Sequence, residues 1–364
     1  MRGLALCLGG LFLAALCGAC GEDLAPVTPG LLQGRATPHF GGAGDQRSPA
    51  LGHGLLAFVD YADDSTGGCE NEDGDPDCAG LLRVVSLEDG AEVGRAEVAD
   101  PRIAVGEGFV VWIDRTDARG YGSGRVFLLW LESGHVERLD QDDAWIERAA
   151  APVVDGHRVA WAQRWPYGTV RILDLETRQH QDLVRQQLSG GVFFDLADEA
   201  VAWQTYDRSD WRPRIALQYL EESEPRLFDP APEHSISGAP ALAPGRVVYR
   251  EQPWSCPGDD PVCGARLVIE DLRGAGRRRI ERPGISRLGP VVIGEAEVFW
   301  LDSSEGPYAL WGAPLTEGAP RRITPEGERL SVSEPIATDG DWVAWASFGE
   351  EDFDLHTGRL RPLP

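Results

Sequence analysis

The feature that most constrains the fold of this chain is an internal repeat. A short apolar run that ends in an aromatic residue recurs seven times, at spacings of 54, 49, 42, 46, 51 and 45 residues. We call the residues that end these runs the anchor aromatics: Phe58, Trp112, Trp161, Trp203, Tyr249, Trp300 and Trp345. A mean spacing of about 48 residues lies in the range of β-propeller blades. The repeat therefore predicts seven similar structural units.

Each unit has the pattern of four short strands. A proline precedes six of the anchor aromatics by nine to eleven residues, at Pro49, Pro101, Pro152, Pro240, Pro290 and Pro335. Turns such as Asp155-Gly156 lie between the two positions, and this dipeptide permits the positive φ of a tight hairpin. A third alternating run follows, as in 171–177, and then a fourth, as in 321–324. Because only stacking in a ring buries both faces of such sheets, we expect an all-β, seven-bladed β-propeller of four-stranded antiparallel blades over residues 45–364.

The repeat resembles that of TolB-type propellers. The best matches run from Pro152 to Thr177 and from Pro320 to Thr324, and the resemblance covers roughly residues 45–364. Residues 354–360 echo the turn that joins the third strand to the fourth. The resemblance implies an exported propeller. The separate N-terminal α/β domain of TolB has no counterpart here, because residues 21–44 are too few to form one.

The N-terminal residues have the composition of an export signal. Arg2 is followed by an apolar stretch over residues 4–16 and then by small residues before Cys20, which predicts a signal peptide over residues 1–19. The sequence Leu16-Cys17-Gly18-Ala19-Cys20 resembles a lipoprotein cleavage site, although ordinary cleavage after Ala19 is also compatible with it. Residues 20–44 would then form a lipidated N-terminus and tether.

The cysteines favour the lipoprotein interpretation. Four of them form two local pairs, Cys69 with Cys78 and Cys256 with Cys263, as expected for disulfides in an oxidising compartment. Cys20 is then the odd cysteine at the first mature position, and we expect it to carry lipid. The predicted location is the bacterial envelope, on its periplasmic or cell-surface face, with the membrane reached through the lipid anchor.

Charge and composition exclude several function classes. The net charge of −25 argues against nucleic acid as a partner. The sequence contains no lysine, which excludes Schiff-base and P-loop chemistry. It also contains no Gly-x-Ser-x-Gly or His-Glu-x-x-His motif.

Acidic residues recur two positions after the anchor aromatic, a place that we call the anchor+2 position. Four of the seven are carboxylates: Asp60, Asp114, Glu251 and Asp302. On equivalent strands they would form a ring near one mouth of the central channel. Two hypotheses remain open. The carboxylates satisfy backbone donors where the strand ends, or they bind a cation or a polar ligand.

The connections that follow this ring are the most variable parts of the repeat, and such loops commonly carry recognition. Asp73, Asp75 and Asp77 alternate as oxygen ligands do in calcium-binding loops, so calcium is a candidate cofactor, with a solvated acidic loop as the alternative. Trp165, Trp211 and Trp254 occupy the same class of connection, where aromatic side chains could contact a protein or a glycan.

These features predict a non-catalytic, lipid-anchored, extracytoplasmic propeller that binds a protein or another envelope component. The first alternative is a carbohydrate-active lyase or hydrolase that uses the acidic channel mouth. The second is a lipoprotein that binds a metal or a solute. No motif in the sequence has a spacing that distinguishes these three functions from one another.

Overall fold

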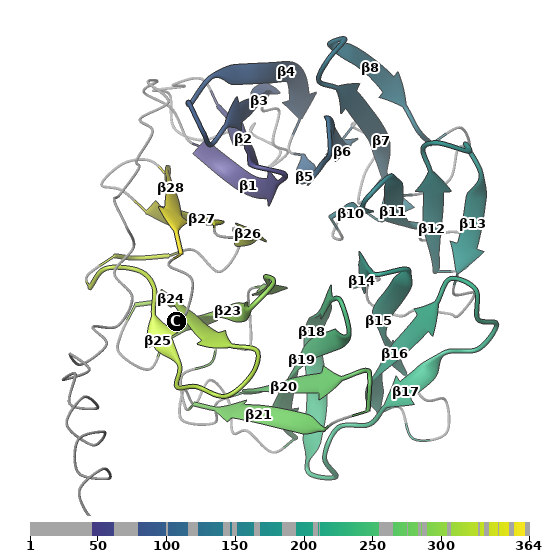
Figure 1. Ribbon diagram of the computed structural model, residues 1–364, viewed down its shortest axis with the longest axis vertical. Coiled ribbons are helices and arrows are strands. Elements are labelled where there is room, and N and C mark those ends of the chain that lie inside the picture. Colours follow the sequence, from purple (N-terminus) through teal and green to yellow (C-terminus); the bar gives the residue numbers. More distant parts are fainter. Residues whose placement is uncertain are drawn as a thin grey trace, which may run out of the picture. The chain divides into compact units, whose positions relative to one another are not determined.

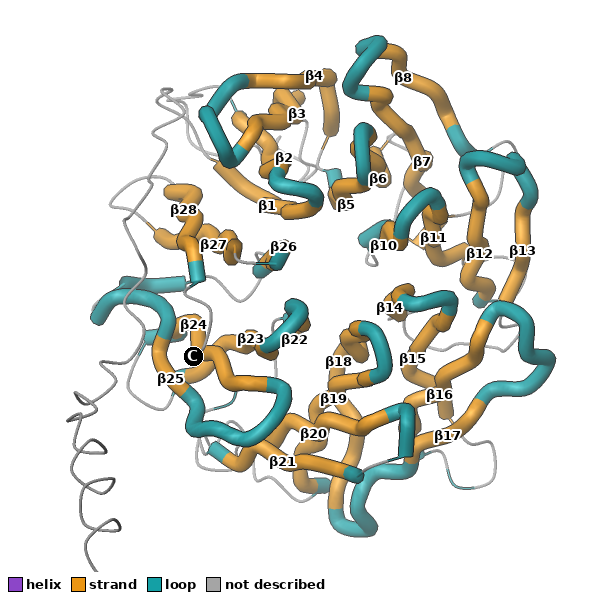
Figure 2. The backbone as a smooth tube through the Cα atoms, in the orientation of Figure 1, coloured by secondary structure: helices purple, strands orange, loops and turns teal. Residues whose placement is uncertain are grey.

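The computed structural model describes residues 46–61, 79–99, 101–115, 123–140, 146–147, 151–163, 168–183, 194–206, 210, 212–254, 265–274, 276–282, 285, 290–303, 307–326, 328–330, 335–340, 342–348 and 353–360. Every regular element in these residues is a β-strand (Figure 2). This part of the chain therefore holds no helix that could cross a membrane.

The strands form seven antiparallel units in chain order. Blade 1 contains β1 (Gln46–Gly52), β2 (Leu55–Asp60), β3 (Ala79–Ser86) and β4 (Glu92–Ala99). Blade 2 contains β5 (Arg102–Gly106), β6 (Phe109–Arg115), β7 (Ser123–Trp130) and β8 (His135–Arg138). Blade 3 contains β10 (Val153–Asp155), β11 (Arg158–Gln163), β12 (Thr169–Asp174) and β13 (His180–Leu183). Blade 4 contains β14 (Phe194–Ala197), β15 (Ala200–Tyr206), β16 (Pro213–Tyr219) and β17 (Arg226–Phe228).

The remaining blades follow the same plan. Blade 5 contains β18 (His234–Ala243), β19 (Arg246–Pro253), β20 (Arg266–Asp271) and β21 (Arg277–Glu281). Blade 6 contains β22 (Val291–Ile293), β23 (Glu297–Asp302), β24 (Ala309–Pro314) and β25 (Arg321–Arg322). Blade 7 contains β26 (Ala337–Asp339), β27 (Trp342–Phe348) and β28 (Phe353–Arg359). The short strand β9 (Ile146–Glu147) pairs with both β7 and β11 and so joins blades 2 and 3.

The blades are arranged in a ring, with the first strand of each blade innermost and the last strand outermost (Figure 1). The predicted seven-bladed, all-β propeller is confirmed. The predicted turn at Asp155-Gly156 is also present, because these residues join β10 to β11 and Gly156 has a φ of 58°. Such a positive φ is easily adopted by glycine.

The core lies between blades rather than within one sheet. Trp203, for example, packs with Val170 and Ile172 of the preceding blade, and Tyr249 packs with Ala202 and Leu217 of blade 4. All seven anchor aromatics are almost fully buried. The repeated aromatic is therefore the residue that each blade uses to pack against its neighbour.

Blade 7 meets blade 1 through the same kind of packing and through one polar contact. Leu56 and Phe58 of blade 1 form one cluster with Ala344 and Leu355 of blade 7. The backbone N–H of Gly54 donates to Oδ2 of Asp339 at 2.7 Å. Blades 1 and 7 are therefore neighbours in the ring.

One local expectation was wrong. Residues 354–360 echo a turn between a third and a fourth strand, yet 353–359 form the continuous strand β28, which pairs with the whole of β27 from Trp342↔Arg359 to Phe348↔Phe353. Backbone pairing along seven residues prevails over the turn preference of the Thr357-Gly358 dipeptide. In the described residues blade 7 therefore has three strands.

Candidate functional site

The anchor+2 position is where each second strand meets the connection that arrives from the preceding blade. Since all second strands run in the same direction, these positions lie at one face of the ring, which we call the anchor+2 face. Three blades share a single backbone pair at this point: Ile146↔Gln163, where β9 meets β11, and the isolated bridges Ile285↔Asp302 and Leu330↔Ser347. The anchor+2 position thus links consecutive blades.

In two other blades a carboxylate makes the same link. The backbone N–H of Ala99, at the end of blade 1, donates to Oδ1 of Asp114 in blade 2 at 2.7 Å. The N–H of Ala231, between blades 4 and 5, donates to Oε1 of Glu251 at 3.4 Å. The sequence left two roles open for these carboxylates. The contacts of Asp114 and Glu251 correspond to the first, in which the acids satisfy backbone donors at the strand end.

Arginines accompany three of the four predicted ring carboxylates. Arg83 of β3 lies 3.1 Å from Asp60. Arg282, which follows β21, donates to Asp302 at 2.8 Å, and its guanidinium carbon is 3.4 Å from the centre of the Trp311 ring. Because a buried carboxylate requires a partner that offsets its desolvation, Arg282 explains how Asp302 can be 1% exposed.

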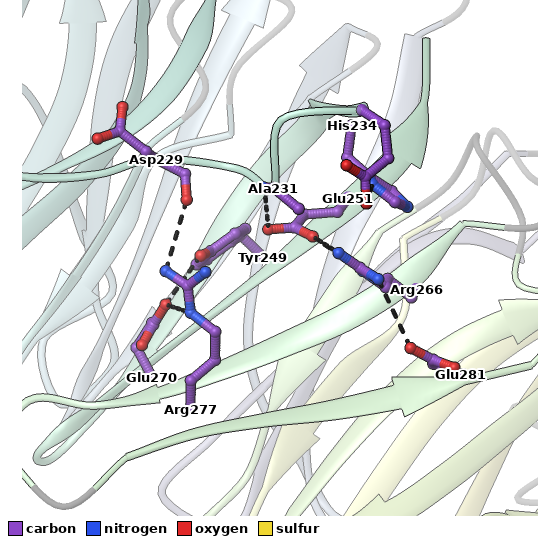
Figure 3. Close-up of polar contacts among 10 residues, drawn as sticks. Asp229, Ala231, His234, Tyr249, Glu251, Arg266, Glu270, Arg277 and Glu281 are labelled. Atoms are coloured by element: carbon purple, nitrogen blue, oxygen red, sulfur yellow. Dashed lines mark hydrogen bonds and ion pairs between the residues drawn. The ribbon is translucent and has the colours of Figure 1, made fainter. Parts of the chain in front are cut away.

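Blade 5 contains an extended network of this kind (Figure 3). Glu251 is completely buried, and its Oε2 accepts hydrogen bonds from Nε and Nη2 of Arg266 at 2.8 and 2.6 Å. The same guanidinium lies 3.5 Å from Glu281, whose side chain is 70% exposed. Arg266 thus connects a buried acid to an exposed one.

A second network in blade 5 surrounds its anchor aromatic. The hydroxyl of Tyr249 donates to Oε1 of Glu270 at 2.9 Å, and Arg277 pairs with the same carboxylate (Figure 3). Nη2 of Arg277 also donates to the backbone oxygen of Asp229 at 3.4 Å. Burial and the neighbouring Glu270 raise the pKa of Tyr249 far above its usual range. Tyr249 therefore remains a protonated hydrogen-bond donor in the packed interior.

A further carboxylate links the inner strands of blades 4 and 5. Oδ2 of Asp195 accepts a hydrogen bond from the backbone N–H of Leu242 at 2.7 Å. Burial, together with the charge of Asp155 on blade 3, raises the pKa of Asp195 to about 7, although the N–H groups of Leu242 and Leu196 act in the opposite direction. Asp195 thus titrates near neutral pH at an inter-blade contact.

Blade 7 contains a serine, a histidine and a glutamate in contact, which the sequence did not reveal. Oγ of Ser347 lies 2.7 Å from Nε2 of His356, and Oε1 of Glu328 lies 3.3 Å from the same nitrogen. The indole N–H of Trp345 donates to Glu328 at 3.1 Å, and its ring stacks on His356. The sequence places Ser347 at anchor+2 and His356 on the partner strand, but only the fold adds Glu328.

The arrangement differs from a catalytic triad. In a triad the acid contacts Nδ1 and leaves Nε2 for the serine, whereas Ser347 and Glu328 both contact Nε2 here. Ser347 and His356 are also only 5% and 6% exposed. The geometry fits an inter-blade link of the kind seen in the other blades.

Two aromatic side chains reach solvent on the anchor+2 face. Tyr206 is 38% exposed at the end of β15, and Trp254 is 51% exposed directly after β19. The N–H of Trp254 donates to the backbone oxygen of Glu233 at 3.1 Å, which fixes the backbone that carries the indole. The other exposed large apolar residues among the described ones are Val93, Val136 and Leu227, and all three lie on outermost strands.

The remaining predicted site residues lie outside the described part of the chain. They are Cys20, Cys69, Cys78, Cys256, Cys263, Asp73, Asp75, Asp77, Trp165 and Trp211. Within the described residues, no group of three or more histidine, cysteine or acidic side chains is placed to hold a metal ion. Ligand binding by Asp60, Asp114, Glu251 and Asp302 stays a prediction, as do lipidation, the disulfides and the calcium site.

Comparisons with known proteins identify the fold. No family model matches the sequence, and no curated protein matches it. Among solved structures, the β-propeller domain of the Trilobed protease from Pyrococcus furiosus, described as having an open velcro topology, is 12% identical, with a TM-score of 0.64, over 86% of this chain and 95% of that one. An oligogalacturonate lyase in complex with manganese is 12% identical, with a TM-score of 0.59, over 85% of this chain and 86% of the lyase.

Peptidases and TolB are also among the matches. Pyrococcus horikoshii acylaminoacyl peptidase is 10% identical with a TM-score of 0.61 over 86% of this chain, which spans 50% of the peptidase. TolB from Acinetobacter baumannii is 10% identical with a TM-score of 0.49, over 77% of this chain and 76% of TolB. At these identities the matches with TM-scores of 0.59 to 0.64 show a β-propeller fold alone, and they do not distinguish a scaffold from an enzyme.

Proposed function

We propose that this chain is a lipid-anchored, exported β-propeller that binds a protein or another envelope component through its anchor+2 face and catalyses no reaction. The observation that carries the proposal is the exposure of Tyr206 and Trp254 on that face, at the second-strand ends of adjacent blades. Tyrosine and tryptophan are enriched at protein interfaces, because each combines a large apolar ring with a polar group.

The state of the carboxylates supports binding over acid–base catalysis. Asp60, Glu251 and Asp302 contact arginines, and Asp114 accepts a backbone N–H. A general acid requires a raised pKa near a substrate, and its partner base must reach the reacting atom. Carboxylates held in intramolecular pairs suit a rigid support for the exposed aromatics better than they suit that chemistry.

Site-specific photo-crosslinking in the native envelope tests the proposal. A photoreactive residue at position 254 should capture one identified partner in stoichiometric yield, whereas the same residue at position 227, which is comparably exposed on an outermost strand, should not. Equal capture at both positions, or no capture together with turnover of a glycan by the purified protein, would favour the enzyme alternative.

The anchor is tested separately. Cys20→Ser should release the protein from membranes into the soluble exported fraction, because stable attachment would depend on lipid at that thiol. An intact mass that shows an unlipidated N-terminus in the wild-type protein would contradict this part of the proposal and leave the partner-binding part standing.

A further inference from the structure

The exposed Trp254 has an acidic residue directly opposite it in the backbone of blade 5. The strands β18 and β19 pair as far as His234↔Pro253. One step further, the N–H of Trp254 donates to the backbone oxygen of Glu233 at 3.1 Å, so Glu233 and Trp254 continue the antiparallel ladder as the next pair. Side chains of directly opposite residues lie on one face, with Cβ atoms about 4.5–5.5 Å apart. The carboxylate and the indole can therefore contact the same group of a ligand.

The Glu233 carboxylate is accessible and carries an available charge. The side chain of Glu233 is 71% exposed. Its Oε1 lies 3.4 Å from Nδ1 of His234, and this pair is ionic only when the histidine is protonated. Among the described residues, no arginine pairs with Glu233. Its charge therefore remains available to a ligand that reaches Trp254.

The backbone that carries this pair is fixed by a buried acid (Figure 3). Oε1 of the completely buried Glu251 accepts the N–H of Ala231 at 3.4 Å, and the oxygen of Ala231 accepts the N–H of His234 at 2.8 Å. Arg266 donates to the other oxygen of Glu251. A ligand-binding surface whose backbone is already fixed loses less conformational freedom on binding. The turn at 231–234 is therefore suited to present its side chains for recognition.

The charged groups near this turn present mainly carboxylates to solvent. Asp229 follows the end of β17 and Glu281 ends β21, so both lie on the anchor+2 face. Their side chains are about two-thirds exposed, whereas the side chains of Arg214 and Arg266, which pair with them, are less than one-fifth exposed. The net charge of −25 acts in the same direction over longer distances. The surface around Trp254 therefore attracts cations.

We propose that the anchor+2 end of blade 5 binds a basic polypeptide segment, with one arginine or lysine side chain held between the Glu233 carboxylate and the Trp254 indole. This rests on the proposed function, to which it adds the chemical class of the partner. An indole attracts a cation to the face of its ring more strongly than other aromatic side chains do, and a carboxylate beside it accepts a charge-assisted hydrogen bond. Asp229 and Glu281 favour a segment with several basic side chains over a single amine.

Fluorescence anisotropy on the full-length exported protein tests this assignment. The probe is a short labelled peptide of alternating arginine and serine, and a peptide with glutamate in place of arginine is its control. The protein should bind the arginine peptide with a Kd that rises with ionic strength, and it should not bind the glutamate peptide. No binding of the arginine peptide, or equal binding of the two, would overturn the proposal.

A pair of charge variants locates the binding site. Glu233→Gln should weaken binding of the arginine peptide about 2–5-fold and reduce its dependence on salt. Glu132→Gln is the matched control, because Glu132 is exposed in the turn between β7 and β8 at the opposite face and the substitution changes the net charge equally. This control should bind as wild type does. Equal weakening in the two variants would mean that long-range charge alone acts, and would overturn the site.

The indole is tested by two substitutions of different character. Trp254→Leu should weaken binding of the arginine peptide about 2–5-fold, whereas Trp254→Phe should keep part of the affinity because phenylalanine retains an aromatic face. Neither should change the Tm appreciably, since the side chain is exposed. Equal loss in the two variants, or no loss in either, would overturn the contact between the cation and the ring.

Failure of this assignment is distinguishable from failure of the proposed function. If the arginine peptide does not bind but a photoreactive residue at position 254 captures a partner, the basic segment is wrong and recognition by the anchor+2 face stands. If neither occurs, both are wrong.

Discussion

Two aromatic residues on the same strand of blade 4 lie in opposite environments. Trp203 is 3% exposed and packs between blades, whereas Tyr206, three residues later, is 38% exposed on the anchor+2 face. Blade 5 repeats the contrast, with Tyr249 fully buried and Trp254 51% exposed. In both blades, one aromatic on the second strand stabilises the ring, and another at or just past the end of that strand is exposed and available for recognition.

The anchor+2 residues lie between the buried and the exposed aromatics. Several of them are buried, as Glu251 and Asp302 are. The anchor+2 residues pair through their side chains with arginines or backbone N–H groups, or through their backbone with the connection from the preceding blade. They fix the strand end on which an exposed aromatic stands. Substitutions of buried residues should therefore change stability, whereas substitutions of the exposed aromatics should change binding.

The largest expected effect on stability comes from the interior. Trp161 is completely buried between blades 2 and 3, and Trp161→Ala should lower the free energy of unfolding by about 3–5 kcal/mol through cavity formation. Chemical unfolding measures the effect. Trp254→Ala is the control and should change stability by about 0.5 kcal/mol or less. Similar losses in the two variants would abolish the distinction between the environments.

The second-largest loss of stability should come from removal of the Arg266 guanidinium, which connects the buried Glu251 to the exposed Glu281. Arg266→Met leaves the buried Glu251 carboxylate without its ion-pair partner, and the cost is about 3 kcal/mol. Glu281→Gln removes only the exposed partner of the same arginine and should cost less than about 1 kcal/mol. An Arg266→Met protein as stable as Glu281→Gln would mean that the buried pair does not hold the strand end.

A smaller effect should depend on pH. The pKa of Asp195 is raised to about 7 in the folded protein, so the folded state binds more protons than the unfolded state between about pH 4 and pH 7. The contribution of Asp195 to stability is therefore lost as pH rises through that window. Asp195→Asn, which can still accept the Leu242 N–H, should gain stability relative to wild type as the pH rises from 4 to 8 and should be nearly equal to it at pH 4. Thermal unfolding at the two pH values would contradict this assignment if the difference between the proteins were constant.

The sequence predicts the fold because the anchor aromatic and its proline recur once in almost every blade. It predicts the anchor+2 carboxylates for the same reason. It does not predict their partners, because Arg83 and Arg266 come from third strands while Arg282 comes from a connection of variable length. The contact between Ser347, His356 and Glu328 likewise depends on how the connection before blade 7 lies against β27.

The measurement that tests the central claim most directly is the affinity of the Tyr206→Ser/Trp254→Ser double variant for the partner captured at position 254, with Leu227→Ser as the exposed control. We predict a loss of at least about 2 kcal/mol in binding free energy for the double variant, as for aromatic residues at the centre of an interface, with unfolding unchanged. The control should bind as wild type does. Full affinity in the double variant, or a loss matched by Leu227→Ser, would show that the anchor+2 face is not the recognition surface.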